Sequence, residues 1–181
     1  EDLTEQGGLA MIFALVMIFA YVMFRFQWKF AAGAVAALAH DVIVTIGFFS
    51  LFALPFDLSV VAAVLAVIGY SLNDTVVAFD RIRENFIKLR GSSSEEAMNI
   101  SINEMLARTI ITGVTTLIVL TALLLLGGAS VRPFSIALIV GIVVGTYSSI
   151  YTAGATALVL KVSAKDLLPP RDDSDPVDDL P

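Results

Sequence analysis

Five long apolar runs dominate the sequence, and short polar segments separate them. The runs cover about residues 9–24, 30–56, 58–79, 102–126 and 133–160. A helix crosses the apolar part of a bilayer in roughly 20 residues, so runs of this length are typical of membrane spans. The runs are apolar on all sides, whereas a helix on the surface of a soluble protein shows one apolar stripe. The pattern predicts an all-α protein, a polytopic transmembrane helical bundle with about five spans.

Polar segments flank this bundle, which we place at residues 9–162. Residues 1–8 are interpreted as an external N-terminal remnant, and residues 163–181 have the proline and aspartate content of a disordered cytoplasmic tail. Ser93 and Glu96 have the spacing of a capping box, and the apolar residues after them follow one stripe. A short interfacial helix is therefore predicted near residues 93–101, before the fourth span.

The basic residues predict the orientation of the chain in the membrane. Lysine and arginine collect at 25–29, at 81–101 and after the fifth span, while the other two connections hold only Arg132. Short loops rich in these residues lie on the cytoplasmic side. The C-terminus is therefore predicted to be cytoplasmic and the N-terminal end external. Because no signal sequence precedes that external end, we interpret the chain as a fragment that lacks an earlier span and an external domain.

Composition supports the membrane class and argues against several functions. Hydrophobic residues make up 57% of the chain, and the mean hydropathy is +0.88, well above the values of soluble domains. The net charge of −6 comes mainly from the two ends, and no basic patch indicates a nucleic acid partner. Cysteine is absent and histidine occurs once, which argues against thiol chemistry and most metal sites. We expect neither a cofactor nor an enzymatic activity.

A carboxylate inside an apolar run is the main candidate for function. Asp74 lies in "GYSLNDTVVAFDRIREN", seven residues before Arg81, and Arg108 lies at a similar distance inside the fourth span. The third and fourth spans are antiparallel, so the two charges are predicted to lie at one depth. Charged residues inside a membrane commonly mark ion or proton paths. Desolvation favours the neutral acid form of Asp74, whereas a nearby cation favours its carboxylate form. A movement of Arg108 toward Asp74 would therefore release a proton from it, and a movement away would permit a proton to bind. A purely structural ion pair is the alternative.

Residues repeating at intervals of four predict which side chains face the interior of the bundle. The small and polar residues that repeat in this way place Asp41, Asp74 and Arg108 on faces toward the interior of the bundle. Asp41 is therefore a further candidate for a proton relay. His40 is more typical of a hydrogen-bonded structural group than of a relay. Small residues permit close contact between helices in membranes, so Gly141, Gly145 and Ser149 are interpreted as a packing stripe. The residues expected to support the central motif are Gly69, Tyr70, Asn73, Thr75, Asp80 and Arg81, with local salt bridges at the Asp80–Arg83, Arg81–Glu84 and Glu84–Lys88 spacings.

Three segments resemble a known family. The segments "FRFQWKFAAGAVAALAHD", "GYSLNDTVVAFDRIREN" and "RTIITGVTTLIVL" are similar to the SecF branch of the SecD/SecF family of bacterial protein-export membrane proteins, and the similarity covers nearly all of residues 9–162. The family layout has six spans and a large extracytoplasmic domain after the first, and this chain matches the last five spans. The resemblance implies that the aspartate and arginine linked to proton conduction in the family fall on Asp74 and Arg108.

The resemblance also implies a function and partners. It implies a subunit of a proton-motive-force-driven accessory complex that assists Sec-dependent protein translocation across the bacterial cytoplasmic membrane. The implied partners are SecD and the Sec translocon channel, with YajC and YidC as further candidates, and a preprotein contacted by regions outside this chain. Two alternatives stay open: a proton-coupled lipid or small-molecule exporter half of the wider resistance–nodulation–division superfamily, and a non-conducting scaffold for the translocon.

Overall fold

The chain folds into five long helices. The computed structural model describes residues 2–26, 28–89 and 93–162, with side chains from residue 5 onward. The helices are α1 (Asp2–Arg25), α2 (Trp28–Leu51), α3 (Leu58–Lys88), α4 (Ser94–Leu126) and α5 (Arg132–Val159), and a short 3₁₀ helix, η1 (Ala129–Val131), precedes α5. Each of the five long helices is sufficiently long and apolar to cross a membrane. The predicted all-α bundle with five spans is confirmed, and the tail at 163–181 lies outside the described residues.

The helix ends differ from the predicted spans at several places. Helix α1 already begins at Asp2, so residues 2–8 belong to the first helix and do not form a separate segment. Helix α2 ends at Leu51 rather than near 56, and Ala53 takes a positive φ of 48° in the turn that follows. Helix α3 continues beyond residue 79 through the charged residues to Lys88. Apolar content indicates the part of a helix that lies in lipid, whereas backbone hydrogen bonding continues into polar flanking residues.

Side chains cap α3 and α4 at their starts. The hydroxyl of Ser93 accepts a hydrogen bond from the backbone N–H of Glu96 at 3.2 Å, as the capping-box spacing indicates. The helix predicted near 93–101 therefore forms, but it is continuous with the fourth span within α4. Asp57 caps α3 and accepts from the backbone N–H of Val60 at 3.1 Å.

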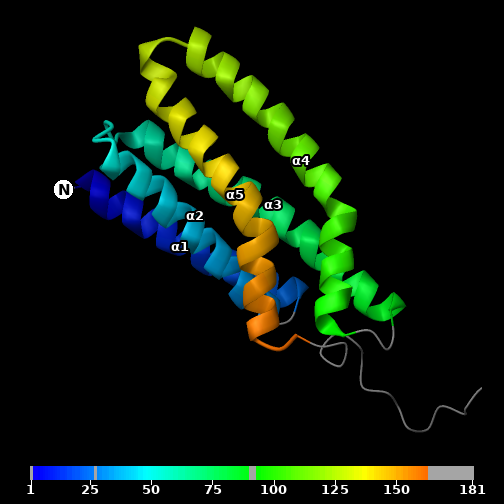
Figure 1. Ribbon diagram of the computed structural model, residues 1–181. Helices are drawn as coiled ribbons and strands as arrows, with labels where there is room; N and C mark the ends of the chain where they lie inside the picture. Colours follow the sequence, from blue (N-terminus) through cyan, green and yellow to red (C-terminus); the bar gives the residue numbers. More distant parts are fainter. Residues whose placement is uncertain (1, 27, 90–92, 163–181) are drawn as a thin grey trace, which may run out of the picture.

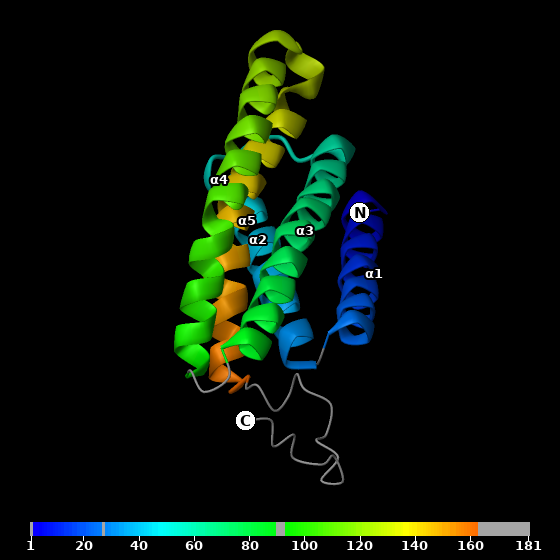
Figure 2. The same cartoon turned by 90° about the vertical axis from the view of Figure 1, so that its right-hand side faces the viewer.

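The helices α2, α3 and α5 form the centre of the bundle. Helix α5 packs against both α2 and α3, while α1 lies mainly along α2, and α4 lies along α5 and α3. Figure 2 shows α1 and α4 on opposite sides of the molecule, and Figure 1 shows α4 joined to α5 at the end distant from the α3–α4 connection. Two helices thus flank a three-helix core.

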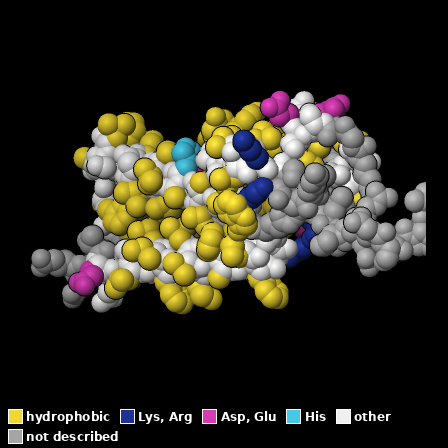
Figure 3. Space-filling view, turned by 90° about the horizontal axis from the view of Figure 1, so that it is seen from below, with side chains coloured by type: hydrophobic (Ala, Val, Ile, Leu, Met, Phe, Trp, Pro, Cys, Tyr) yellow, Lys and Arg dark blue, Asp and Glu magenta, His cyan; other side chains and the backbone are white. Residues whose placement is uncertain are grey.

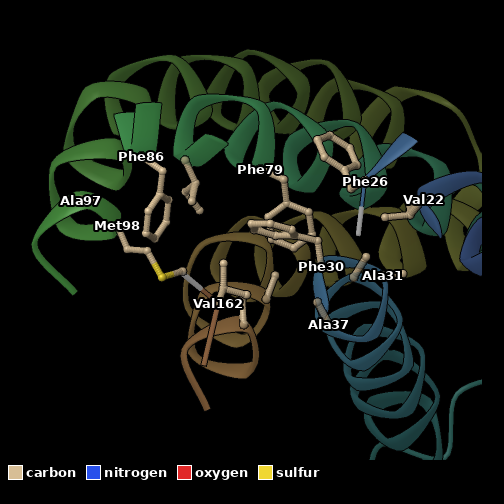
Figure 4. Packing of buried hydrophobic residues seen from close by; sticks show 14 residues of the cluster. Val22, Phe26, Phe30, Ala31, Ala37, Phe79, Phe86, Ala97, Met98 and Val162 are labelled. Carbon is tan, nitrogen blue, oxygen red and sulfur yellow. The ribbon is translucent and has the colours of Figure 1, made fainter. Parts of the chain in front are cut away.

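Buried hydrophobic residues from all five helices meet at the end of the bundle where α1 joins α2. Figure 4 shows the rings of Phe26, Phe30 and Phe79 together in this cluster. The ring centroids of Phe30 and Phe79 are 4.7 Å apart, and those of Phe26 and Phe79 are 5.9 Å apart. Met98 of α4 and Ala153 of α5 belong to the same cluster. This cluster holds the helix ends together next to the polar residues of α3.

Candidate functional site

Asp74 lies inside the bundle without a complete set of hydrogen-bond partners. Its side chain is on α3 and is only 6% exposed. The Oδ2 atom is buried and has no hydrogen-bond partner. Nearly all buried polar atoms in folded proteins are paired, so an unpaired carboxylate oxygen requires an explanation.

Arg108 lies on the neighbouring helix at about the same depth as Asp74. Ala78 of α3 and Met105 of α4 belong to one buried cluster. Asp74 is four residues before Ala78 and Arg108 is three residues after Met105 on an antiparallel helix, which places the two within about one turn, roughly 5 Å, along the bundle axis. Arg108 is also the charged group that acts on Asp74 electrostatically. Among the described residues, however, no ion pair joins Asp74 to Arg108.

The structure does not bury Arg108, which differs from the prediction that it faces the interior. Its side chain is exposed in the isolated chain. The reason lies in α4, which contacts its neighbours along a narrow stripe that includes Met105, Thr109 and Gly113. Arg108 is next to this stripe, on its edge. Arg108 thus lies beside the contact between α3 and α4 and not within it.

Asp41 has the opposite surroundings, because both of its carboxylate oxygens have partners. The side chain is fully buried on α2. Its Oδ2 accepts a hydrogen bond from the Ser71 hydroxyl of α3 at 2.7 Å, and its Oδ1 lies 3.2 Å from Nδ1 of His40. A Cβ atom at Gly145 of α5 would lie 3.4 Å from the same Oδ2. Asp41 therefore lies where three helices meet.

Three hydroxyl groups near the two aspartates are buried without partners. They are the hydroxyls of Thr45, Tyr70 and Thr75. Thr45 is one helical turn from Asp41, Tyr70 is one turn from Asp74, and Thr75 follows Asp74 directly. Together with Asp74 Oδ2, these atoms account for every buried side-chain polar atom that lacks a partner in the described part of the chain. The unpaired polar atoms thus gather on α2 and α3 around the two carboxylates.

The remaining motif residues of α3 lie on its outer face. Gly69 and Asn73 are exposed, and a Cβ atom at Gly69 would meet none of the described residues within 4 Å.

The packing stripe on α5 lies against α3. A Cβ atom at Gly141 would lie 2.2 Å from Cγ2 of Val67, and Ser149 is buried. The glycine at 141 is thus required for the close approach of α5 to α3.

Charged and polar side chains link the helices at the end of α3 that leads to α4. Asp80 pairs with Arg25 of α1 at 3.0 Å rather than with Arg83 as the spacing suggested. Arg81 pairs with Glu84 at 2.9 Å, and Glu84 pairs with Lys88, as the spacings predicted. Arg81 also lies 3.7 Å from Glu104 of α4. These residues tie together the ends of α1, α3 and α4.

Two polar residues of α3, Ser71 and Asn85, were not singled out from the sequence. Ser71 donates to Asp41, and Asn85 donates to both Ser101 and Glu104 of α4 at 3.0 Å. Ser71 lies three residues before Asp74 and so on the same side of α3, which is a signal that the sequence does offer. Nothing in the sequence around Asn85 shows that its partners are on the next helix. In the described segments, no group of three His, Asp or Glu side chains has an arrangement that could hold a metal ion.

Comparison with known proteins gives consistent matches along the chain. The family described as "Protein export membrane protein SecD/SecF, C-terminal" matches residues 1–163. The Protein translocase subunit SecF of Pseudomonas aeruginosa is 54% identical over 181 residues, which are 100% of this chain and 59% of the relative. The corresponding subunit of Escherichia coli O157:H7 is 49% identical over 167 residues, 92% of this chain and 52% of the relative. The chain thus spans only part of the length of these relatives.

Solved structures show the same arrangement of helices. The crystal structure of SecDF, a translocon-associated membrane protein from Thermus thermophilus, has a TM-score of 0.84 and 45% sequence identity. The match covers 89% of this chain and 22% of the SecDF chain. A crystal structure of SecDF in a super-membrane-facing form has a TM-score of 0.83 with the same coverage. The chain therefore belongs to the SecD/SecF family of protein export membrane proteins.

Proposed function

We propose that the chain is part of a SecF subunit in an accessory complex that assists Sec-dependent protein translocation across the bacterial cytoplasmic membrane. In this proposal the proton-motive force drives the complex, protons pass through Asp74, and Arg108 modulates its protonation. SecD is the partner subunit, a role supported by the SecDF structures that match this chain. The N-terminal end of the described helices is external in this proposal, and the C-terminal end is cytoplasmic.

The observation that carries the proposal is the unpaired state of Asp74. A carboxylate that carries protons must alternate between its charged and neutral forms. A buried ion pair with ideal geometry would hold it in the charged form, and removing one partner would leave an uncompensated charge. Asp74 is buried with Oδ2 unpaired, and Arg108 is near it but not bound to it. This arrangement supports a group that exchanges protons rather than a fixed structural pair.

Arg108 supplies the second requirement, which is control over when the proton leaves. A cation close to a carboxylate favours the charged form, and desolvation favours the neutral acid. Because Arg108 is exposed on the edge of the α4 contact stripe, its guanidinium can approach Asp74 or withdraw with little change in helix packing. Approach would release the proton from Asp74, and withdrawal would permit the next one to bind.

Proton flux in vesicles that contain the full-length protein with its partner subunit tests this function. Asp74→Asn keeps the size of the side chain but cannot ionise, so we expect folded, inserted protein that has lost proton flux and proton-driven export. We expect Arg108→Leu to abolish both as well, because Asp74 would then stay protonated. Asp57→Asn makes the same chemical change at the start of α3, where asparagine caps a helix about as well as aspartate, and serves as the matched control.

The double variant separates the proposed proton carrier from a structural ion pair. If the two charges were only a salt bridge, each single variant would damage folding, and the double variant Asp74→Asn with Arg108→Leu would recover stability and export together. A proton carrier predicts that the double variant folds but stays inactive. Proton flux at the wild-type level in Asp74→Asn would contradict the proposal and favour a non-conducting scaffold.

A further inference from the structure

A hydrogen-bonded chain of three side chains runs from the surface of α2 into the centre of the bundle. His40 Nδ1 lies 3.2 Å from Asp41 Oδ1, and the Ser71 hydroxyl donates to Asp41 Oδ2 at 2.7 Å. We propose that Asp41 is a second proton-carrying site, which exchanges protons with the surface through His40 and with Asp74 through Ser71. This inference rests on the proposed function, because it extends the proton path that includes Asp74.

His40 connects this chain of side chains to the outer face of α2. Its side chain is 39% exposed, whereas Asp41 next to it is 0% exposed. Figure 3 shows the single histidine of the sequence at the surface of the molecule, with hydrophobic side chains around it. Imidazole takes up and releases protons in the physiological pH range more readily than any other unperturbed side chain. The proton that it binds at Nδ1 points to the carboxylate of Asp41.

Asp41 is surrounded by groups that leave its charge uncompensated. From α2 it faces His40, from α3 it faces Ser71, which follows Tyr70 directly and lies about one turn before Asp74, and from α5 it faces Gly145. Its two side-chain partners are thus an imidazole and a hydroxyl, and neither is a lysine or an arginine. A buried carboxylate without a cationic partner is costly in its charged form. Asp41 therefore has no permanently charged partner that would hold it in its ionised form.

Ser71 connects the two carboxylates because a hydroxyl both donates and accepts hydrogen bonds. It lies three residues before Asp74, which places the two side chains about 5–6 Å apart at Cβ on one side of α3. Asp74 Oδ2 has no hydrogen-bond partner among the described residues, so it is available to a donor on this side of α3. Gly145 leaves room for this contact, since a Cβ atom there would lie 3.2 Å from Cβ of Ser71. Rotation of the hydroxyl from Asp41 toward Asp74 would link the two carboxylates.

One proton moves from His40 to Asp74, and protons and charge are conserved at each step. Protonated His40 gives its Nδ1 proton to Asp41 Oδ1, which leaves a neutral imidazole and a neutral carboxylic acid. The carboxyl group turns about its Cβ–Cγ bond, so that the proton faces Ser71. Ser71 accepts this proton and passes its own to the carboxylate of Asp74, directly or through one water molecule. Asp41 is then a carboxylate again, and Asp74 is neutral. The reverse sequence returns a proton from Asp74 to His40.

Three variants test this path in vesicles that contain the full-length protein and its partner subunit, with proton flux measured across a range of pH. Asp41→Asn still accepts the hydrogen bond from Ser71 but cannot carry a proton, and His40→Asn keeps a donor at the position of Nδ1. Ser71→Ala removes the connecting hydroxyl. We expect each variant to fold and to lower proton flux about a hundredfold or more, the lower end of the usual contribution of a proton-transfer group. His40→Asn should also change the shape of the pH profile.

Ser148→Ala is the matched control for Ser71→Ala. Ser148 is fully buried on α5, and its hydroxyl bonds to the carbonyl of Gly145 in its own helix, so its removal should leave proton flux unchanged. A fixed structural role for Asp41 predicts normal flux in Asp41→Asn, and that result would overturn the inference. Should Asp41→Asn fail to fold, His40→Asn at the surface decides, because an unchanged rate and pH profile would overturn the inference as well.

Asp74→Asn in the same vesicles distinguishes this inference from the proposed function. Loss of flux in Asp74→Asn with normal flux in the other three variants would refute the path through Asp41 and leave the proposed function intact. Normal flux in Asp74→Asn would refute the proposed function, and the further inference with it.

Discussion

The three central helices and the two flanking helices are all apolar enough to span a membrane, but they differ in how they pack. In the most apolar stretches of α3 and α5, 50% of the residues are buried inside the chain, whereas the figures for α1 and α4 are 11% and 17%. Their mean hydropathies do not follow this order, because α1 and α4 reach 2.4 and α3 and α5 only 1.8. The helices that are most buried are therefore the less apolar ones.

This difference has a physical cause. In a membrane, lipid and protein interior are about equally apolar, so burial within the bundle depends on close packing and polar contacts. The central helices contain the small residues Gly33, Gly141 and Gly145, which approach their neighbours closely. They also contain Asp41 and Asp74, which lipid would not accommodate. The flanking helices present large apolar side chains such as Phe13 and Ile118 on their surfaces. Arg108 lies where the two kinds of helix meet.

Replacing Gly141 should have the largest effect on the stability of the bundle, because it would separate two central helices. A Cβ atom at this position would already lie 2.2 Å from Cγ2 of Val67, so Gly141→Leu forces α5 away from α3. We expect the free energy of unfolding in lipid bicelles to fall by about 3 kcal/mol, the upper part of the usual cost of overpacking. Thermal unfolding of the purified protein should show the same direction.

Gly47 provides the control for this variant. It lies on the exposed side of α2, and a Cβ atom there would meet nothing within 4 Å. Gly47→Leu makes the same substitution in a central helix, at a position where the described residues leave open space for the new side chain. Equal destabilisation by the two substitutions would mean that leucine affects the helix itself and that close packing at Gly141 is not the cause.

Most of the fold could be predicted from the sequence because length and apolar content determine a membrane span directly. The five spans and the Ser93 cap followed from local pattern alone. The helix predicted near residues 93–101 forms the first turns of α4 and continues without a break into the fourth span. A change from amphipathic to fully apolar sequence shows where lipid begins, and it does not show whether the backbone hydrogen bonding is interrupted.

The candidate site could be predicted only in part, because a side chain's partners depend on how helices turn toward one another. A carboxylate in an apolar run is conspicuous in any sequence, so Asp74 and Asp41 could be found. The exposure of Arg108 could not, because it depends on how narrow the contact stripe of α4 is. The contact of Asp41 with Ser71 joins residues 30 positions apart, and no local spacing indicates it. The proton-carrying roles of Asp74 and Asp41, and the modulating role of Arg108, stay predictions.

Asn85 tests how the flanking helix α4 is attached to the central helix α3. Its side-chain amide donates to Ser101 Oγ and to Glu104 Oε2, both at 3.0 Å. Asn85→Ala removes both contacts, one of them to a charged group, so we expect the free energy of unfolding to fall by about 2 kcal/mol. Hydrogen exchange should increase in the first turns of α4 and not in α2. An increase of the same size in both helices would contradict the view that α4 is a separate, peripheral element.

The smallest expected effect concerns Asp57, the cap that starts α3 outside its apolar part. The Ser59 hydroxyl, which donates to the Asp57 carboxylate at 2.5 Å, and the backbone N–H of Val60 lower the pKa of Asp57 below its ordinary value. A pKa that is lower in the folded state stabilises the protein above the unfolded-state pKa, about 4, and this contribution is lost as the pH falls through the folded-state value.

Asp57→Ala should lower the free energy of unfolding at neutral pH by about 0.5–1 kcal/mol. Asp57→Asn keeps the cap without its charge, so it should lower the stability at pH 7 by less than Asp57→Ala does, and the decrease below pH 4 should become smaller. Unfolding measured at pH 7 and at pH 3 for both variants decides: an unchanged pH dependence in Asp57→Asn would show that the carboxylate charge does not contribute to the start of α3.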